Sequence, residues 1–424
     1  MKILVLSRSF PPIIGGISFS EKEFYDNFVM NNHKLSLFIF PYNFKRRYSF
    51  NKPSIDPLSI KKFFPRNSLA ILINLVSFIK EICTLKCSLR FKVKILFYFL
   101  NRLILLLNLI NFYEIVKYYD RKYDYDLILC FDSYMPVYIG YFIKKKCKKK
   151  LVILAHGNDI LDDRLYPLQK RALRGADQII TRTNFIKNLV SNRFTISKSK
   201  ISVCGDGLKP EEFEIGESKS ELRKELGIDQ NDFVIITVGA LNSFRKGFDL
   251  VLKSLKELRE KYNLNLSKIK YILIGHKNEK VENWLKSIAY KNDLIDNFKI
   301  LVDLSDQLRN KYYKASDIFV MPSRDMINKG SIEGFGKVFI EAAYFRLPSI
   351  GANTGGIPEV IVDGKSGFVI DKHEELAEKI LLLYKDKQLR LMLSEFAHKN
   401  VLENYTQEKV YETYLKIFNR IINK

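Results

Sequence analysis

The stretch 333–370, EGFGKVFIEAAYFRLPSIGANTGGIPEVIVDGKSGFVI, carries the pattern that decides the fold. A glycine-punctuated turn runs into an apolar segment, which we expect to be a helix that begins near Gly336 or Lys337. The run LPSIGA (347–352) predicts a buried strand after this helix, and DIFVMP (317–322) predicts another before it. A strand, a loop, a helix and a second strand in this order are typical of a parallel α/β unit.

The same pattern recurs in both halves of the chain. Short aliphatic runs without polar alternation suit strands that are covered on both faces, as in parallel sheets with helical crossovers. Two sets of such runs predict an α/β protein of two doubly wound, Rossmann-like domains that face each other across a cleft. The other predicted strands are KILVLS (2–7), LSLFIF (35–40), DLILC (126–130), LVILA (151–155), QIIT (178–181), ISVC (201–204), FVIITVG (233–239), IKYILIG (269–275) and FKILV (298–302).

The length of 424 residues also favours two domains over a single core. The segment GDGLKPEEFEIGESKS (205–220) is rich in glycine, proline and charge, so we place the boundary there. This gives an N-terminal domain over 1–205 and a C-terminal domain over 206–404. Residues 405–424 have helical periodicity, and we expect this last helix to cross back to the N-terminal domain.

The chain is strongly basic, with a formal net charge of +23. Such an excess favours an anionic partner, which can be nucleic acid, a membrane surface or a polyphosphate ligand, although biased codon usage also contributes lysine. Five scattered cysteines without a C-x-x-C unit indicate neither a disulfide framework nor a zinc site. The start, MKILVLSRSFPP, has too short an apolar run for a signal peptide. We therefore expect a cytoplasmic protein.

Residues 57–119 break the α/β pattern with apolar segments that are flanked by lysine and arginine. The longest uncharged run, 103–113, has 11 residues, which is fewer than the roughly 18–20 that a membrane-spanning helix needs. Two interpretations stay open. These helices pack on the N-terminal domain, or they lie in the interface of an anionic membrane.

The opening stretch also predicts an anion site. Gly334 and Gly336 free the backbone at the start of the expected helix, and the amides of its first turn can bind phosphate. Glu333 and Glu341 can then accept hydrogen bonds from hydroxyl groups on either side of that phosphate. This arrangement suits a nucleotide sugar, which has a ribose, a diphosphate and a hexose in a row. The alternative is a surface helix with two solvated acids.

Two further loops follow predicted strands. Arg245 and Lys246 come after the strand 233–239, where two cations at the carboxyl end can neutralise a diphosphate. Gly15 and Gly16 follow the first strand and permit close approach of the backbone to a ligand. For Arg245 and Lys246 the alternative is an ordinary surface pair. The loop with Gly15 and Gly16 does not have the G-x-G-x-x-G form of a dinucleotide fingerprint.

One histidine and one acidic motif also invite a functional interpretation. His156 ends the predicted strand 151–155 and is followed by glycine, which makes it a candidate functional group. The triplet DYD (124–126) has the D-x-D form of a metal site, but it directly precedes a predicted strand, as a polar lead-in would. We expect no metal.

The motifs PPIIGGI, AHGNDI, RKGFDL and the stretch quoted at the outset together resemble glycosyltransferase family 4, whose members are retaining enzymes with the GT-B fold. The resemblance is most specific over 317–371 and poorest over 41–125. It implies that the N-terminal domain faces the acceptor and that the C-terminal domain binds the nucleotide sugar.

The resemblance also implies roles for single residues. Glu341 would hold the ribose hydroxyls and Glu333 the donor hexose, while Arg245 and Lys246 would bind the diphosphate. Family members often have an arginine where this chain has Ala240, so Arg245 would have to take over that role.

Backbone amides would complete the donor site that the resemblance implies. Those from the C-terminal domain would come from the turn that includes Gly334, and those from the N-terminal domain would come from its first loop. His156 would lie at the acceptor-facing edge of the donor sugar and, with Glu333 and Lys246, make up the catalytic set. The residues whose amides would cap the diphosphate are Phe335, Gly336, Lys337, Gly15 and Gly16.

The implied activity is transfer of a hexosyl group from a nucleoside diphosphate sugar to a hydroxyl of a saccharide or lipid-linked acceptor, without a metal or other cofactor. Surface polysaccharide or glycolipid assembly at the inner face of the membrane would fit the basic charge. The alternatives are an inactive GT-B scaffold and a basic protein that binds membrane or nucleic acid. No nucleic-acid recognition motif accompanies the charge, so we expect no nucleic-acid partner.

Overall fold

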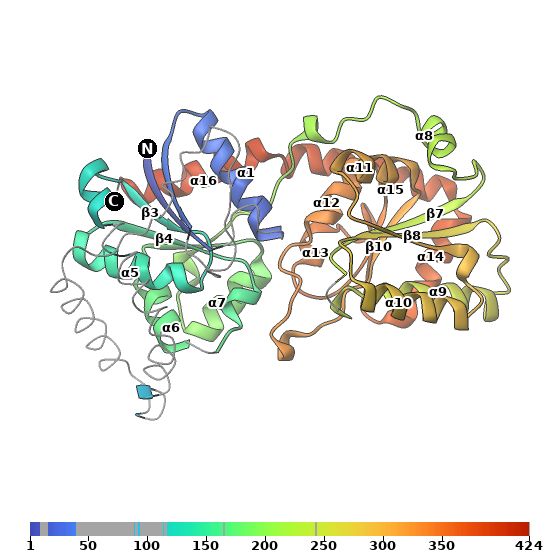
Figure 1. Cartoon of the computed structure of the whole chain (residues 1–424), viewed down its shortest axis with the longest axis horizontal. Coiled ribbons are helices and arrows are strands. Elements are labelled where there is room, and N and C mark those ends of the chain that lie inside the picture. The colour runs from blue at the N-terminus through green and yellow to red at the C-terminus, as the bar shows by residue number, and fades with distance from the viewer. Residues whose placement is uncertain are drawn as a thin grey trace. The chain divides into compact units, whose positions relative to one another are not determined.

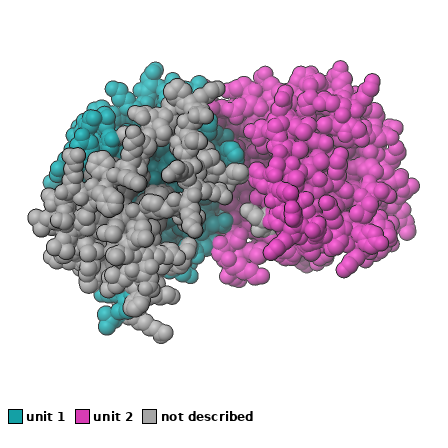
Figure 2. Space-filling view, in the orientation of Figure 1, with its two compact units in different colours: residues 1–204, 411–424 teal, residues 205–410 magenta. Residues whose placement is uncertain are grey.

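The structure is a computed structural model that describes residues 1–8, 16–39, 89, 92–93, 113, 117–163, 166–241 and 244–423. The described chain divides into two compact units (Figure 2). Unit 1 contains residues 1–204 and 411–424, and unit 2 contains residues 205–410. Gly15 and most of the segment 57–119 lie outside the described residues, and so do both interpretations of that segment.

Unit 1 contains a six-stranded parallel sheet in the order β2-β1-β3-β4-β5-β6 (Figure 1). Its order reverses between β1 and β3, because β1 pairs with β2 on one side and with β3 on the other. The strands are β1 (Lys2–Ser7), β2 (Lys34–Ile39), β3 (Leu127–Cys130), β4 (Lys150–Ala155), β5 (Gln178–Thr181) and β6 (Ile201–Val203).

Helices cover both faces of this sheet. On one face a core cluster joins strand residues such as Ile128 to α5 and α6. On the other face aromatic side chains of α1 and α16 pack together, with the ring of Phe24 4.9 Å from that of Tyr414. The helices are α1 (Gly16–Met30), α5 (Met135–Cys147), α6 (Tyr166–Gly175), α7 (Asn184–Phe194) and α16 (Gln407–Ile422).

Unit 2 repeats this architecture with a six-stranded parallel sheet in the order β12-β11-β10-β7-β8-β9. Neighbouring residues of β7 enter different clusters, Ile235 one and Ile236 the other, so this sheet is also buried on both faces. The strands are β7 (Phe233–Val238), β8 (Ile269–Gly275), β9 (Phe298–Val302), β10 (Ile318–Met321), β11 (Ser349–Ala352) and β12 (Gly367–Ile370).

The helices of unit 2 follow its strands in the order of a doubly wound fold. The helix α12 begins at Lys337, as the glycine pattern predicts, with Gly336 as its N-cap residue. The helices are α8 (Lys219–Leu226), α9 (Phe248–Glu260), α10 (Glu279–Lys291), α11 (Asp306–Ala315), α12 (Lys337–Tyr344), α13 (Ile357–Val360), α14 (Leu376–Lys385) and α15 (Lys387–Asn404).

The two parallel, doubly wound sheets confirm the predicted fold class. One strand, β12, is absent from the predicted set. It has four residues and begins at Gly367, where a Cβ atom would lie 2.0 Å from the carbonyl oxygen of Ser349. Within the described part of the chain, no helix is long and apolar enough to cross a membrane.

Gly140 offers a test of the packing in unit 1. A Cβ atom on this residue of α5 would lie 2.5 Å from Sγ of Cys130 and 3.0 Å from Cδ1 of Leu151. We expect Gly140→Ala to lower the free energy of unfolding by about 1–3 kcal/mol, because the helix must move away from the sheet. Urea unfolding followed by circular dichroism measures the change.

The matched control is Gly216→Ala, since a Cβ atom there meets no atom within 4 Å. Equal stability of the two variants would contradict the close packing of α5 on β3 and β4.

Candidate active site

The candidate site lies at the point in unit 2 where the strand order reverses. The strand β7 pairs with β8 on one side and with β10 on the other. Loops that leave the carboxyl ends of strands at such a point diverge, and ligands bind in the space that they leave. The two loops concerned contain residues 244–247 after β7 and residues 322–336 after β10.

A buried carboxylate joins these two loops. Oε2 of Glu333 accepts a hydrogen bond from Nη1 of Arg245 and another from Nζ of Lys246, both at 2.6 Å. Nε of Arg245 also donates to Oγ of Ser331 at 3.1 Å. Glu333 is 9% exposed and Arg245 8%, so these charges interact with little screening by water. The structure therefore brings three of the predicted site residues into contact.

The two cations fix the charge of Glu333. Burial alone would raise the pKa of this carboxyl, but the charges and hydrogen bonds of Lys246 and Arg245 outweigh it and lower the pKa to about 2. Glu333 is therefore ionised at neutral pH. Arg245 and Lys246 carry two positive charges, and the single negative charge of Glu333 balances one of them.

The turn that carries the cations depends on a glycine. Gly247 has φ +74°, and a Cβ atom there would lie 2.2 Å from the carbonyl oxygen of Pro322. The amide of Arg324 donates to the carbonyl oxygen of Arg245 at 2.7 Å, and its guanidinium group makes two hydrogen bonds to Asp249. These contacts hold the loops after β7 and β10 against each other.

Two adjacent glycines, Gly355 and Gly356, hold the loop that carries Glu333. The amide of Gly356 donates to the carbonyl oxygen of Glu333 at 2.8 Å. Gly355 has φ +59°, and a Cβ atom on it would lie 2.1 Å from that same oxygen. Gly336, with φ +87°, then turns the chain into α12 without a side chain that could cap its first turn. The loop therefore presents the amino end of α12 on the side of Glu333.

Glu341 lies in α12 and is also buried. Its Oε2 atom accepts a hydrogen bond from the hydroxyl of Tyr313 at 3.1 Å. Burial and then the charge of Glu341 raise the pKa of Tyr313, so this hydroxyl stays protonated and donates. Burial alone would lower the pKa of Arg309, but nearby acids, led by Glu341, raise it. The carboxylate thus has a donor and a cation of α11 beside it.

The remaining predicted residues of unit 2 belong to the same loop. Gly334 and Lys337 flank the turn into α12. The side chain of Phe335 is 6% exposed and packs against Tyr405, so only its backbone can contribute to a ligand site.

In unit 1, His156 follows the carboxyl end of β4, as predicted. Its Nε2 atom lies 2.7 Å from the carbonyl oxygen of Phe131, and its Nδ1 atom lies 3.3 Å from Nε of Arg182. A neutral ring that carries its proton on Nε2 satisfies both contacts, since it donates to the carbonyl and accepts from the guanidinium. Gly16 begins α1.

The comparisons with known proteins agree with this geometry. Residues 218–400 match the family model described as Glycosyl transferases group 1, and residues 83–212 match the model described as Glycosyltransferase Family 4. The chain is a member of the GT4-type glycosyltransferases. This confirms the family that the motifs predict.

Two relatives are also named as glycosyltransferases. One is an uncharacterised glycosyltransferase of Methanocaldococcus jannaschii, 24% identical over 308 residues that cover 69% of this chain and 75% of the relative. Another is the capsular polysaccharide biosynthesis glycosyltransferase CapM of Staphylococcus aureus. It is 27% identical over 271 residues, which cover 61% of this chain and 66% of CapM.

Solved structures confirm the GT-B fold. A glycosyltransferase from Rickettsia africae superposes with a TM-score of 0.72 at 17% identity, over 99% of both chains. Sucrose-phosphate synthase from Thermosynechococcus elongatus gives a TM-score of 0.72 at 15% identity, over 100% of this chain and 99% of the synthase.

In this GT4-type glycosyltransferase, three residues that the sequence analysis did not predict contact the predicted site residues. Tyr313 and Ser331 hydrogen-bond to predicted residues, and Gly355 contacts the backbone of Glu333. The glycine pair belongs to a motif that the sequence displays. Tyr313 and Ser331 carry no local signal, because their contacts depend on how α11 and the 331 loop pack.

Both aspartates of the D-x-D triplet make contacts within unit 1. Oδ2 of Asp126 accepts a hydrogen bond from the amide of Lys2 at 2.8 Å, and Asp124 forms an ion pair with Lys149 at 2.5 Å. Both acids therefore lie at the amino end of β3. Among the described residues, no group of three or more His, Cys, Asp or Glu side chains could hold a metal ion.

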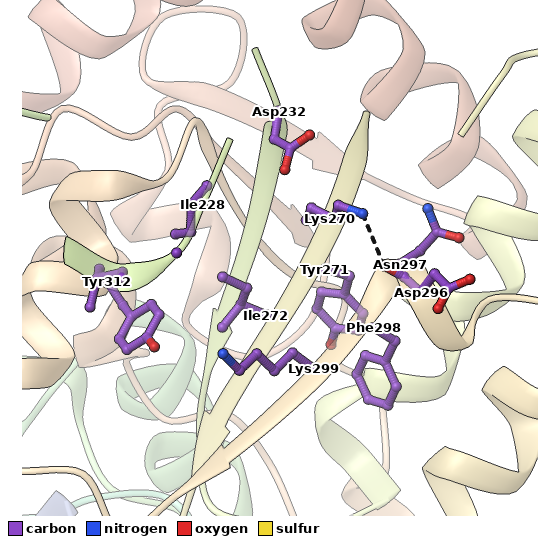
Figure 3. Close-up of a pocket in the computed structure, with 12 residues that line it drawn as sticks. Ile228, Asp232, Lys270, Tyr271, Ile272, Asp296, Asn297, Phe298, Lys299 and Tyr312 are labelled. Carbon is purple, nitrogen blue, oxygen red and sulfur yellow. Dashed lines mark hydrogen bonds between the residues drawn. The ribbon is translucent and has the colours of Figure 1, made fainter. Parts of the chain in front are cut away.

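One cavity of unit 2 has none of the candidate-site residues in its lining. Figure 3 shows the residues that line it. It has a volume of about 260 Å³ and is lined by the first residues of β8 and β9, including Lys270 and Lys299. Nζ of Lys270 donates to the carbonyl oxygen of Asp296 at 3.0 Å. Because this cavity adjoins the amino ends of the strands, it is not the expected position for the donor.

Replacing Glu333 tests the buried ion pairs. We expect Glu333→Gln to lower the free energy of unfolding at pH 7 by about 3 kcal/mol, because Arg245 and Lys246 lose their shared counter-charge. The only tryptophan, Trp284, lies in unit 2 with its ring 5.7 Å from that of Phe244, so its fluorescence during urea unfolding reports on this unit.

The pH dependence gives a second readout. The pKa of Glu333 is lowered from 4.5 to about 2 on folding, so its contribution is complete above pH 4.5 and is lost as the pH falls towards 2. The stability difference between wild type and Glu333→Gln should therefore shrink below pH 4.5. The exposed Glu378→Gln is the control, and a difference that stays constant down to pH 3 would contradict the assigned pKa.

Proposed function

We propose that this enzyme is a retaining, metal-independent hexosyltransferase. Its donor is a nucleoside diphosphate sugar, and its acceptor is a hydroxyl of a saccharide or lipid-linked glycan in surface polysaccharide or glycolipid assembly. The observation that carries the proposal is the buried contact of Glu333 with Arg245 and Lys246 beside the amino end of α12.

The charges of this group suit the diphosphate. Two cations share one carboxylate, and the group lies at the carboxyl ends of parallel strands, where ligands of such folds bind. The amino end of α12 adds the partial positive charge of a helix terminus. A diphosphate would offset the remaining positive charge. Arg245 already donates hydrogen bonds to Glu333 and Ser331, so Lys246 is the better candidate to bind the phosphate oxygens.

The two glutamates suit the two ends of the donor. Glu333 is ionised and has a second carboxylate oxygen that can accept a hydrogen bond from a hexose hydroxyl. Glu341 lies one turn into α12 and can accept from the ribose hydroxyls, with Tyr313 orienting its other oxygen. The family resemblance supports both assignments, together with that of His156 to the acceptor-facing edge of the sugar.

Relatives supply further support. Solved structures of HepE from Anabaena contain UDP, UDP with glucose, or UDP-glucose, and one of them superposes on this chain with a TM-score of 0.68 at 17% identity. CapM is named for capsular polysaccharide biosynthesis. A lipid-linked acceptor would bring the enzyme to the inner face of the membrane, where its net charge of +23 favours an anionic surface.

The proposed reaction breaks the bond between the anomeric carbon and the leaving diphosphate oxygen. A new bond forms between that carbon and the acceptor oxygen on the same face of the sugar, and the acceptor proton passes to the leaving diphosphate. Negative charge grows on the diphosphate as its bond breaks. Lys246, Arg245 and the amides of α12 would stabilise this charge without reorganising, which lowers the barrier.

The test replaces Lys246 and Glu341 conservatively. We expect Lys246→Met to lower kcat by about 10²–10³, because a preorganised charge at the leaving group is lost while the methylene stem stays. We expect Glu341→Gln to weaken binding of the nucleoside diphosphate. Sugar transfer from UDP- and GDP-sugars to a lipid-linked acceptor, and thermal stabilisation by UDP or GDP, provide the measurements.

Exposed residues of the same unit provide the controls, namely Lys280→Ala and Glu378→Gln. Near-normal transfer by both Lys246→Met and Glu341→Gln would refute the site. Stabilisation of the wild type by neither nucleotide, together with no transfer, would favour an inactive scaffold instead.

A further inference from the structure

A second concave surface lies at the opposite edge of the sheet of unit 2. A cavity of about 400 Å³ adjoins Asp317 and Pro348, which immediately precede β10 and β11. The candidate donor site follows the carboxyl ends of these strands, whereas this cavity is at their amino ends. Its volume is within the range of cavities that bind small molecules.

The lining of this cavity is strongly cationic. Five basic side chains from four separate segments contribute to it, against two carboxylates. Because the segments are far apart in the sequence, the fold itself gathers these charges. The basic residues are Lys219 of α8, Lys314 of α11, Arg346 after α12, and Lys387 and Arg390 of α15.

Both carboxylates of the lining are already paired. Asp317 accepts from Nζ of Lys219 and from Nη2 of Arg223, each at 2.7 Å. Glu395 forms an ion pair with Arg346. Neither of these two acids therefore forms an ion pair with the other basic side chains of the cavity.

None of the other three basic residues forms an ion pair within the described residues, although the charge of Lys314 acts at longer range on Glu217 and Glu221. Nζ of Lys314 donates to the carbonyl oxygen of Ile215 at 2.7 Å, and Nη1 of Arg390 donates to that of Tyr384 at 3.0 Å. Lys387 is exposed at the first position of α15. In the described part of the chain no ion pair joins these three residues to a carboxylate, so an anion in the cavity would find three positive charges.

Apart from Ser316 and Ser394, the rest of the lining is apolar. Phe345, Leu347, Pro348 and Leu391 form this part of the wall, and Leu391 is 49% exposed. A phosphate group would occupy only part of the volume, so the apolar wall has room for an attached organic body. The cavity suits a phosphate monoester better than a bare inorganic ion.

We propose that this cavity is a binding site for a phosphate monoester, with the phosphate on Lys314, Lys387 and Arg390 and its organic part on the apolar wall. The ligand is either a free phosphorylated small molecule or the headgroup of an anionic lipid, since both present the same group.

The site has a direct connection to the candidate donor site. The helices α12 and α15 pack side by side (Figure 1). The cavity is lined by residues 345–348, which directly follow α12, and Glu341 lies in that helix. A ligand would therefore contact the end of the same eight-residue helix, which is about 12 Å long.

The test measures binding of glycerol 3-phosphate by isothermal titration calorimetry. We expect saturable binding by the wild type and at least about a tenfold weaker affinity for Lys387→Glu, because a charge-assisted contact is replaced by repulsion. A glutamate at the first position of α15 suits the helix dipole, so this variant should fold. Lys314→Gln provides a second variant with the same expected direction.

Two controls distinguish this cavity from other basic surfaces. Lys286→Glu, an exposed reversal on α10, should bind like the wild type, and so should Lys246→Met of the donor site. Lys387→Glu should retain its rate of sugar transfer without added ligand. Equal loss in Lys286→Glu, or loss in Lys246→Met with retention in Lys387→Glu, would each overturn the proposal.

A vesicle arm separates the two sources. Phosphatidylcholine vesicles with and without phosphatidic acid are sedimented with wild type and Lys387→Glu. If wild type sediments with the acidic vesicles and Lys387→Glu does not, the ligand is a lipid headgroup. If wild type binds glycerol 3-phosphate but does not sediment with the acidic vesicles, the ligand is a free phosphate monoester. Failure of the wild type in both arms would overturn the site.

Discussion

The contact on which the candidate site depends is the buried carboxylate of Glu333 between two cations. Removing three charged groups from water is costly, and the cost is offset only if each charge has a close partner. Glu333 meets this condition, since Arg245 and Lys246 both approach Oε2 to 2.6 Å. The contact joins the loops after β7 and β10, which would otherwise diverge at the reversal of strand order. It therefore fixes the positions of both cations at the carboxyl ends of the strands.

Glycines make this contact geometrically possible. The backbone of residues 245–247 approaches that of 322–324 so closely that a Cβ atom on Gly247 would overlap the carbonyl oxygen of Pro322. Gly355 does the same for the carbonyl oxygen of Glu333. Both residues have positive φ, which side chains other than glycine rarely adopt. The ion pairs thus need three backbone segments at contact distance, and local glycine patterns in the sequence mark those segments.

These patterns explain what could be predicted and what could not. Aliphatic runs located the central strands, and the EGFG turn located the start of α12, because both are local signals. The strand β12 was missed because it begins with a glycine, which marks a turn in the sequence but here allows β11 to approach closely. The sequence placed Arg245 and Lys246 on a diphosphate, but it could not predict that both contact Glu333, 87 or 88 residues away. Nor could it pair Tyr313 with Glu341, since this contact depends on how α11 packs against α12.

Basic side chains of unit 2 form two groups at opposite ends of its strands. In unit 2, one cationic group lies at the carboxyl ends of the strands around Lys246, and another lies at the amino ends around Lys387 and Arg390. The first contains a carboxylate that is buried with it, and the second contains acids that are already paired elsewhere in its wall. Both groups therefore contain more cations than carboxylates, but only in the first is the carboxylate buried between the cations. This difference in composition is the physical reason to assign a sugar donor to one edge of the sheet and a simple phosphate monoester to the other.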